Sequence, residues 1–275
     1  MTKAIDTIQT IASDYDVIVF DQWGVLHNGS MPYPGALGAI AGLDGKTAVL
    51  SNSGKRSAPN LDRIAKMGFD TKVFDFVMTS GEALWRDVQN GAIDARSVRA
   101  IERADGDAAN WAEGLDITLT NDENQAEAIL LMGLPDRSEL SHWIESLEAW
   151  KARGLTVYCS NPDRQSPRAG RLVISPGALA FAYTEMGGNV VFYGKPYLPV
   201  FKAVEQVFGS GRYLMVGDSM EHDIAGAQSA GWDSLLIEGG LYAERFAQGK
   251  SEDVLIEIAR EKDCNLPTYR SRGLR

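Results

Sequence analysis

The stretch Asp16-Val17-Ile18-Val19-Phe20-Asp21 decides the fold of this chain. Its four middle residues are apolar and mostly β-branched, and a short continuous run of this kind is typical of a parallel strand buried on both faces. Asp21 follows the run directly, so it lies at the carboxyl end of the predicted strand. Open α/β sheets place their reactive groups at that edge. Because a lone carboxylate is costly to bury, we expect Asp21 to meet a metal, a cation or an electrophile.

The composition narrows the class of protein. Hydrophobic residues make up 44% and charged residues 23% of the 275 residues, which suits one large α/β domain or two smaller ones. A net charge of -10 argues against a nucleic-acid surface. No apolar stretch reaches the ~20 residues of a membrane span, and Cys159 and Cys264 give neither a disulfide framework nor a metal-ligand spacing. We therefore expect a cytoplasmic protein without a nucleic-acid or membrane partner.

Strand-like runs alternate with helical patterns, which predicts βαβ units and a doubly wound, parallel-sheet (Rossmann-like) α/β core. Core strands are expected at 17–20, 47–50, 73–78, 190–193, 213–216 and 234–237. The pattern of predicted elements changes from about residue 83. Short strands are expected at 98–101, 117–119, 128–132 and 156–159, with a helix at 138–153 between the last two. We predict a core domain of residues 1–82 and 176–275, and a smaller α/β domain inserted at 83–175. The basic end of the chain, 269–275, is expected to fray.

Polar residues follow four of the predicted core strands. The first strand leads to Asp21, the second to Ser51 and a glycine-containing turn, and a third to Gly194-Lys195-Pro196. The fourth leads to the loop Gly217-Asp218-Ser219-Met220-Glu221-His222-Asp223, which opens a helix. In a doubly wound sheet these ends converge. Asp21 and Asp218 would together hold one Mg²⁺, which prefers few carboxylates with water and phosphate oxygens, while the Ser51 hydroxyl and its turn would hold phosphate oxygens.

This combination resembles the haloacid dehalogenase (HAD) superfamily, whose members are mostly phosphatases that work through an aspartyl-phosphate. The four motifs match in order. The inserted unit lies between the second and third motifs, as in the class IIA branch with its α/β cap. Further stretches that look like that branch are Pro34-Gly35-Ala36, Ser51-Asn52-Ser53, Asn161-Pro162-Asp163 and Gly226-Ala227-Gln228-Ser229-Ala230-Gly231. The resemblance covers most of residues 15 to 240.

The resemblance implies a role for each matching residue. Asp21 would attack phosphorus, and Mg²⁺ would be held by Asp21, the backbone carbonyl of Trp23 and Asp218. Asp223 would support the metal site without binding the metal. Lys195 would bind phosphoryl oxygens and offset carboxylate repulsion around the nucleophile. The remaining residues expected to bind the substrate or its phosphate are Ser51, Asn52, Ser53 and Asn161. The expected ligand is a small phosphorylated metabolite, and class IIA caps suggest a homodimer.

The chain departs from this family at Trp23. Phosphatases of the family carry a second Asp here, which protonates the leaving group and then activates water, whereas an indole N–H is only a hydrogen-bond donor. Such acid-base assistance is typically worth 10²–10⁴-fold. Three interpretations follow. The first is a slow or specialised phosphatase, with water, the substrate or another group such as His27 handling the protons. The second is a dehalogenase-like enzyme in which Asp21 attacks carbon. The third is a pseudoenzyme that binds a phosphorylated ligand.

Overall fold

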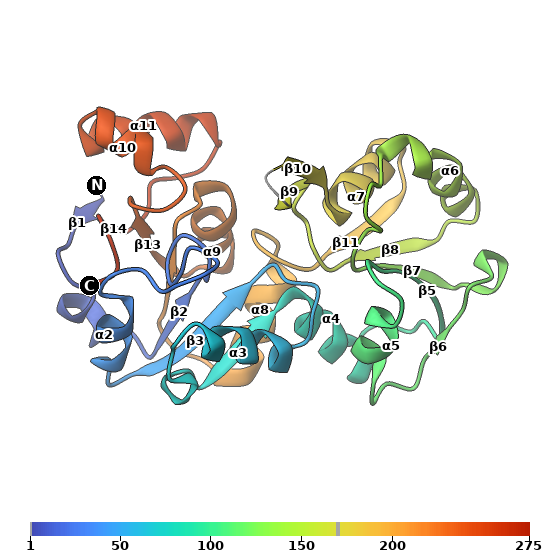
Figure 1. Cartoon of the computed structure of the whole chain (residues 1–275), viewed down its shortest axis with the longest axis horizontal. Coiled ribbons are helices and arrows are strands. Elements are labelled where there is room, and N and C mark those ends of the chain that lie inside the picture. Colours follow the sequence, from blue (N-terminus) through green and yellow to red (C-terminus); the bar gives the residue numbers. More distant parts are fainter. Residues whose placement is uncertain (1, 169–170) are drawn as a thin grey trace. The chain divides into compact units, whose positions relative to one another are not determined.

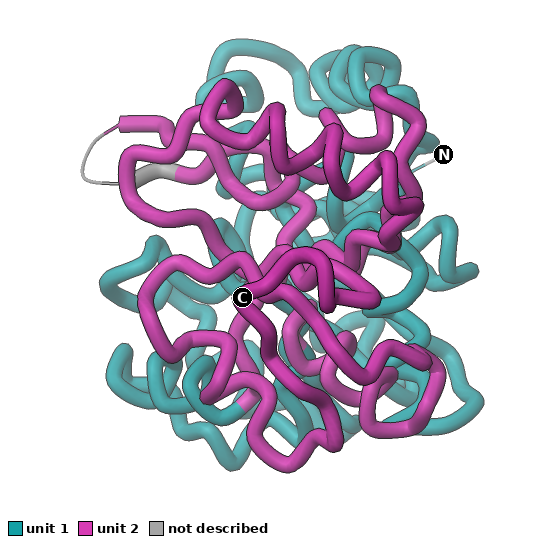
Figure 2. Tube along the Cα trace, turned by 90° about the vertical axis from the view of Figure 1, so that its right-hand side faces the viewer, with its two compact units in different colours: residues 1–51, 58–78, 195–275 teal, residues 52–57, 79–194 magenta. Residues whose placement is uncertain are grey.

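The computed structural model describes residues 2–168 and 171–275, which form two compact units. Unit 1 comprises residues 1–51, 58–78 and 195–275, and unit 2 comprises residues 52–57 and 79–194, as coloured in Figure 2. Each unit contains its own mainly parallel sheet with helices beside it (Figure 1). The predicted α/β class is therefore confirmed.

Unit 1 is built on a seven-stranded sheet whose pairs from β1 to β3 are parallel. In spatial order its strands are β1 (Lys3–Ala4), β14 (Tyr269–Ser271), β13 (Asp233–Ile237), β12 (Tyr213–Gly217), β2 (Val17–Phe20), β3 (Lys46–Ser51) and β4 (Phe76–Thr79). The helices along this part of the chain are α1 (Gln9–Ala12), α2 (Ala36–Ala41), α3 (Ser57–Lys66), α8 (Leu198–Phe208), α9 (Ala225–Ala230), α10 (Ala243–Gln248) and α11 (Ser251–Glu261). A 3₁₀ turn, Thr71–Val73, precedes β4, so the strand predicted at 73–78 starts later.

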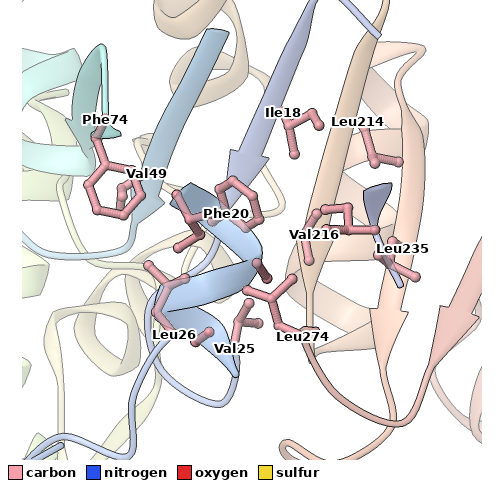
Figure 3. Packing of buried hydrophobic residues seen from close by; sticks show 14 of the residues in the cluster. Ile18, Phe20, Val25, Leu26, Val49, Phe74, Leu214, Val216, Leu235 and Leu274 are labelled. Carbon is pink, nitrogen blue, oxygen red and sulfur yellow. The ribbon is translucent and has the colours of Figure 1, made fainter. Parts of the chain in front are cut away.

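Strand β2 is buried on both faces, as its apolar run predicts. All four of its residues are buried. Ile18 and Phe20 belong to a cluster with Val49 of β3 and Val216 of β12, labelled in Figure 3. Val17 and Val19 are outside that cluster, since successive side chains of a strand point to opposite faces. Strand β2 is therefore a central strand, and its register with β12 (Val216 opposite Phe20) brings the residues after both strands to the same edge.

Unit 2 contains a five-stranded, all-parallel sheet. Its order is β11 (Asn189–Phe192), β8 (Thr156–Cys159), β7 (Ala128–Leu131), β5 (Ser97–Ile101) and β6 (Thr118–Leu119), and a hairpin of β9 (Gln165–Arg168) and β10 (Arg171–Ile174) accompanies it. Its helices are α4 (Ser80–Gln89), α5 (Asp107–Ala112), α6 (Ile144–Ala152) and α7 (Pro176–Glu185). Residues 140–143, predicted as the start of a longer helix at 138–153, form a separate 3₁₀ turn before α6.

The division of the chain differs from the predicted boundaries at residue 176. Strand β11 was expected in the core sheet, but it pairs with β8, with Val190 opposite Val157. The preceding helix α7 buries Leu179 and Tyr183 in the same cluster as Val157. Because both elements complete the hydrophobic core of unit 2, this unit continues to Gly194 rather than ending at residue 175.

The end of the chain is ordered, contrary to the expectation that it frays. Tyr269–Ser271 form β14, which pairs with β13 on one side and β1 on the other. Leu274 is buried in the main core cluster of unit 1. Backbone N–H groups near the start of the chain also bond to it, such as that of Ile8 to the carbonyl of Arg275 at 3.1 Å. These long-range contacts hold a segment whose arginines make it look like a solvated tail.

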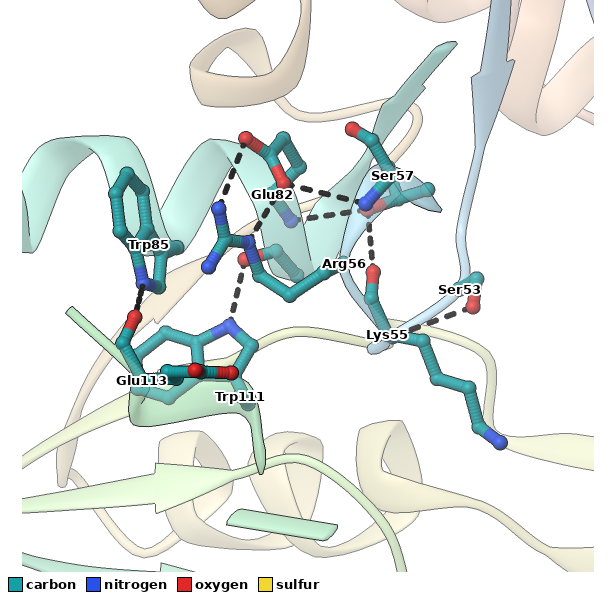
Figure 4. Close-up of polar contacts among 10 residues, drawn as sticks. Ser53, Lys55, Arg56, Ser57, Glu82, Trp85, Trp111 and Glu113 are labelled. Atoms are coloured by element: carbon teal, nitrogen blue, oxygen red, sulfur yellow. Dashed lines mark hydrogen bonds and ion pairs between the residues drawn. The ribbon is translucent and has the colours of Figure 1, made fainter. Parts of the chain in front are cut away.

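A charged cluster of unit 2 surrounds the start of helix α4, and Figure 4 labels four of its residues, Arg56, Ser57, Glu82 and Trp85. Together with Thr79 we call them the Arg56 cluster. Arg56 Nε lies 2.7 Å from Glu82 Oε2, and the Ser57 N–H donates to the same oxygen at 3.2 Å. The Thr79 side chain caps the helix by accepting the N–H of Glu82 at 2.9 Å, and the guanidinium lies 3.7 Å from the Trp85 ring centroid. Burial opposes ionisation of Glu82, but Arg56 and Ser57 outweigh it and lower the pKa of this carboxyl.

Candidate active site

Four charged residues predicted from separate strand ends meet at one edge of the unit 1 sheet: Asp21, Lys195, Asp218 and Asp223. We call them the carboxylate cluster. Asp21 follows β2, Asp218 follows β12, and Asp223 lies in the π-helical turn Met220–Ile224 that leads into α9. Oxygen atoms of the three carboxylates all lie within 4.8 Å of one another. Lys195, from the loop before α8, completes the group. The predicted convergence of these side chains is therefore observed.

Lys195 links two of the three carboxylates. Its Nζ lies 2.5 Å from Asp21 Oδ1 and 2.7 Å from Asp223 Oδ1, and its side chain is only 4% exposed. Burial disfavours the charged amine, but the two carboxylates outweigh this effect and raise the pKa of Lys195 above its usual range. Lys195 is therefore a fixed cation beside Asp21 rather than a proton donor.

Asp223 is held by backbone as well as by Lys195. Its Oδ2 accepts the N–H groups of Asp218 at 3.1 Å and Ser219 at 3.0 Å. Gly217 allows this approach, because a Cβ on it would lie 2.1 Å from the Asp223 Cβ. With both of its oxygens engaged, Asp223 orients Lys195 and the loop after β12. Its role in supporting a bound metal stays a prediction.

Asp218 lies between two glycines that the sequence analysis missed. A Cβ on Gly24 would lie 1.6 Å from Asp218 Oδ2, and one on Gly240 would lie 2.4 Å from the same atom. The N–H of Leu241 donates to Oδ2 at 2.7 Å and orients the carboxylate. The Gly239-Gly240 pair, at the carboxyl end of β13, was the available sequence signal. Since Gly24 touches Asp218, the Trp23–Gly24 peptide lies beside the cluster, where the Trp23 carbonyl was expected.

Negative charge exceeds positive charge in this cluster, and this affects its protonation. Burial raises the pKa of Asp21, Lys195 lowers it and Asp223 raises it, and the result is about 7. Burial and the charges of Asp21 and Asp223 raise the pKa of Asp218 to about 8. Three carboxylates against one ammonium leave a surplus of negative charge that a divalent cation would neutralise. Because all the side-chain donors are carboxylate oxygens, the set fits a hard cation such as Mg²⁺.

The other predicted site residues are distributed between the units. Ser51 ends β3, beside β2 in the sheet, so it reaches the edge that carries Asp21. Asn52, Ser53 and Asn161 belong to unit 2. There Asn52 Nδ2 donates to Asp163 Oδ1 at 3.0 Å, and Asn161 Oδ1 accepts the N–H of Asp163 at 2.9 Å. These bonds shape the loop after β8, and the binding role of the three unit 2 residues stays a prediction.

His27 does not replace the missing Asp. Its side chain is fully buried, and its Nδ1 accepts the N–H of Gly29 at 3.0 Å. Burial, with a smaller effect of Arg63, lowers the pKa of His27 to about 4, so the ring is neutral at neutral pH. A neutral imidazole enclosed in the loop cannot protonate a leaving group. The alternative role considered for His27 is therefore wrong.

Comparison with known proteins identifies the family. Residues 18–106 match the model of the haloacid dehalogenase-like hydrolases, and residues 192–259 match the HAD-hydrolase-like model. This chain belongs to the haloacid dehalogenase superfamily. It is 27% identical to chronophin of Mus musculus over 244 residues, which cover 84% of this chain and 83% of that protein. The class IIA assignment and the hydrolase class predicted from the motifs are both confirmed.

Solved structures share the fold over nearly the whole chain. A haloacid dehalogenase-like hydrolase from Brucella suis 1330 has a TM-score of 0.77 and 26% identity, covering 98% of this chain and 100% of that one. A glycerol phosphate phosphatase from Mycobacterium tuberculosis in complex with magnesium has a TM-score of 0.73 and 23% identity, covering 100% and 78%. HAD phosphatases use Mg²⁺, the cation that the carboxylate cluster fits. Within residues 2–168 and 171–275, no helix is both long and apolar enough to cross a membrane.

Proposed function

We propose that this chain is a Mg²⁺-dependent hydrolase of small organic phosphomonoesters that acts through an aspartyl-phosphate on Asp21. The observation that carries the proposal is the carboxylate cluster: three Asp oxygens within 4.8 Å of one another, with the Lys195 ammonium on two of the Asp side chains. Phosphoryl transfer needs positioning and charge neutralisation, and this arrangement supplies both. The named phosphatases among the similar proteins, such as the M. tuberculosis glycerol phosphate phosphatase, support the same reaction class.

Each residue of the cluster has a separate task in this reaction. Asp21, fixed by Lys195 at 2.5 Å, attacks phosphorus. Asp21, the Trp23 carbonyl and Asp218 would hold Mg²⁺, which would neutralise phosphoryl oxygens when bound. Asp223 keeps Lys195 in place, and the ammonium attracts the transferred phosphoryl group and lowers repulsion between that group and Asp21. Ser51, at the same sheet edge, would contribute a hydroxyl to the phosphoryl oxygens.

The test is phosphate release from a panel of small phosphomonoesters, with Mg²⁺ and with a chelator. Turnover that requires Mg²⁺ and is lost in Asp21→Asn supports the proposal. Halide release from haloacids without Mg²⁺ would instead assign attack on carbon.

Trp23 in place of the acid-base Asp favours a second candidate, a pseudoenzyme that binds a phosphorylated metabolite. Saturable Mg²⁺-dependent binding of a phosphate ester, with neither phosphate release nor a phosphorylated Asp21, would assign that role.

A further inference from the structure

Trp23 stands at the sequence position where phosphatases of this family carry the Asp that protonates the leaving group. Its side chain is 53% exposed, and the indole packs on the turn at Gly29, where a Cβ would lie 2.4 Å from Cζ2 of the ring. Its centroid is 6.2 Å from that of His27, at an interplanar angle of 75°. An indole N–H does not ionise at neutral pH and its nitrogen is not basic, so Trp23 offers neither a general acid nor a general base.

The other acidic groups around this position in unit 1 are already engaged. The carboxylates of Asp21 and Asp223 hold Lys195. Asp21 and Asp218 are also the proposed Mg²⁺ ligands, and because bound Mg²⁺ displaces their protons neither has one to donate. Glu221 accepts the hydroxyl of Tyr242 and pairs with Lys262, and these partners outweigh burial and lower its pKa to about 2. Glu221 is therefore ionised at neutral pH and has no proton to donate.

The phenol of Tyr33 is another proton-bearing group of unit 1, and the charge of Asp218 acts on it. Burial, with the charge of Asp218, raises the pKa of this phenol above its ordinary value of 10.0. A phenol that holds its proton so firmly is a much weaker acid than the carboxylic acid it would have to replace. Among the described residues of unit 1, we find no group placed and charged to act as the missing acid.

We propose that the substrates of this enzyme are phosphates whose leaving group departs as an anion without being protonated, namely aryl, enol or acyl phosphates. The inference rests on the phosphatase function proposed above and names its substrate class. In the first step a bond forms between Asp21 Oδ and phosphorus while the bond from phosphorus to the leaving oxygen breaks. The electron pair stays on that oxygen, which takes a proton later from solvent. Only a leaving group whose conjugate acid is already acidic tolerates this route.

The missing acid-base group also affects the second step, in which water hydrolyses the aspartyl-phosphate. A water oxygen must bond to phosphorus as the bond to Asp21 Oδ breaks, and the water protons pass to phosphate and solvent, because no carboxylate base removes them. This step is therefore slower than the first for a good leaving group. Phosphorylated Asp21 accumulates, the leaving group appears in a burst, and kcat becomes the same for all good substrates.

The experiment measures kcat/KM with Mg²⁺ for p-nitrophenyl phosphate, phenyl phosphate and glycerol phosphate, in which the leaving group becomes steadily less acidic. We expect kcat/KM to fall by about 10²–10⁴-fold along this series, the range that general-acid assistance usually supplies. Rapid mixing with p-nitrophenyl phosphate should give a burst of about one nitrophenolate per enzyme. Values of kcat/KM within tenfold across the series would overturn the inference while leaving the proposed function intact.

Two variants test whether Trp23 causes a steep dependence of kcat/KM on the acidity of the leaving group. Trp23→Asp supplies a carboxyl, so the ratio of kcat/KM for glycerol phosphate to that for p-nitrophenyl phosphate should rise by about 10²-fold. Trp23→Phe keeps an aromatic ring without an acid and should keep the steep dependence; a flat dependence in Trp23→Phe would overturn the inference. If no substrate, including acetyl phosphate, gives Mg²⁺-dependent release or a phosphorylated Asp21, the proposed function fails and the inference with it.

Discussion

The two units each bury a charged cluster, and the clusters differ in how their charges balance. In the Arg56 cluster one carboxylate meets one guanidinium and a backbone N–H, the guanidinium lies over the face of Trp85, and the pKa of Glu82 falls. In the carboxylate cluster three carboxylates share one ammonium, and the pKa values of Asp21 and Asp218 rise to about 7 and about 8. A balanced cluster stabilises the fold without a ligand. A cluster with surplus charge needs a cation or a proton to complete it, which is what a binding site requires.

Asp21→Asn should have the largest effect, because it removes a charge from the cluster that has a surplus and so changes activity and stability in opposite directions. Activity should fall by about 10³-fold or more, since the amide cannot attack phosphorus. Stability without Mg²⁺ should nevertheless rise at pH 8, because the variant removes one of the surplus negative charges. Thermal unfolding of both proteins in chelator checks this result. A less stable Asp21→Asn protein would mean that the Asp21–Lys195 bond contributes more than the charge surplus costs.

Gly24→Ala should damage the metal site far more than the fold. Its Cβ would lie 1.6 Å from Asp218 Oδ2, and the residue has a φ of +79°. We expect Mg²⁺ affinity to fall by about 10²-fold, the upper effect of disturbing a residue that orients a ligand. Gly231→Ala is the matched control, because Gly231 has a φ of +76° and no atom within 4 Å of an added Cβ. Calorimetric titration with Mg²⁺ would contradict the prediction if both variants bound equally.

Glu82→Gln tests the balanced cluster. Glu82→Gln removes the negative charge that Arg56 binds, and because Arg56 is partly exposed we expect a loss of about 2–3 kcal/mol in the free energy of unfolding. Mg²⁺ affinity should stay unchanged. Asp116→Asn removes the exposed pair of Asp116 with Arg96 and should change stability little. Equal losses in the free energy of unfolding for Glu82→Gln and Asp116→Asn, measured with denaturant, would refute the stabilising role of the Arg56 cluster.

The pH dependence of the Mg²⁺ affinity is the smallest of the expected effects and also concerns the surplus charge of the carboxylate cluster. The folded pKa values of Asp21 and Asp218 lie above their ordinary value of 3.8, so protonation favours the metal-free fold. This contribution is complete below about pH 4 and is lost as the pH rises through about 7 to 8. Mg²⁺ must displace these protons, so its affinity should increase about tenfold from pH 7 to pH 8. Titrations at both pH values check this, and an unchanged affinity would contradict the raised pKa values.

Much of the carboxylate cluster could be predicted from the sequence because two of its residues directly follow buried parallel strands. Asp21 and Asp218 are placed by β2 and β12, whose apolar runs are recognisable locally. The sequence does not say which sheet a strand joins. The run Asn189–Phe192 looks like any buried strand, and only its pairing with β8 assigns it to unit 2. The partners of Glu82 were equally hidden, since Arg56 lies 26 residues away.

Strand β14 has a consequence for the order in which the chain folds during synthesis. Lys3–Ala4 pair only with Tyr269–Arg270, and β14 in turn separates them from β13. Residues 3–4 are synthesised well before residues 269–271, so they have no place in the sheet until residues near 270 have emerged. A nascent chain stalled before that point would leave one edge of the sheet incomplete, with β13 exposed to other strands. Addition of β14 and then β1 to the sheet thus acts as the step that closes this edge against aggregation.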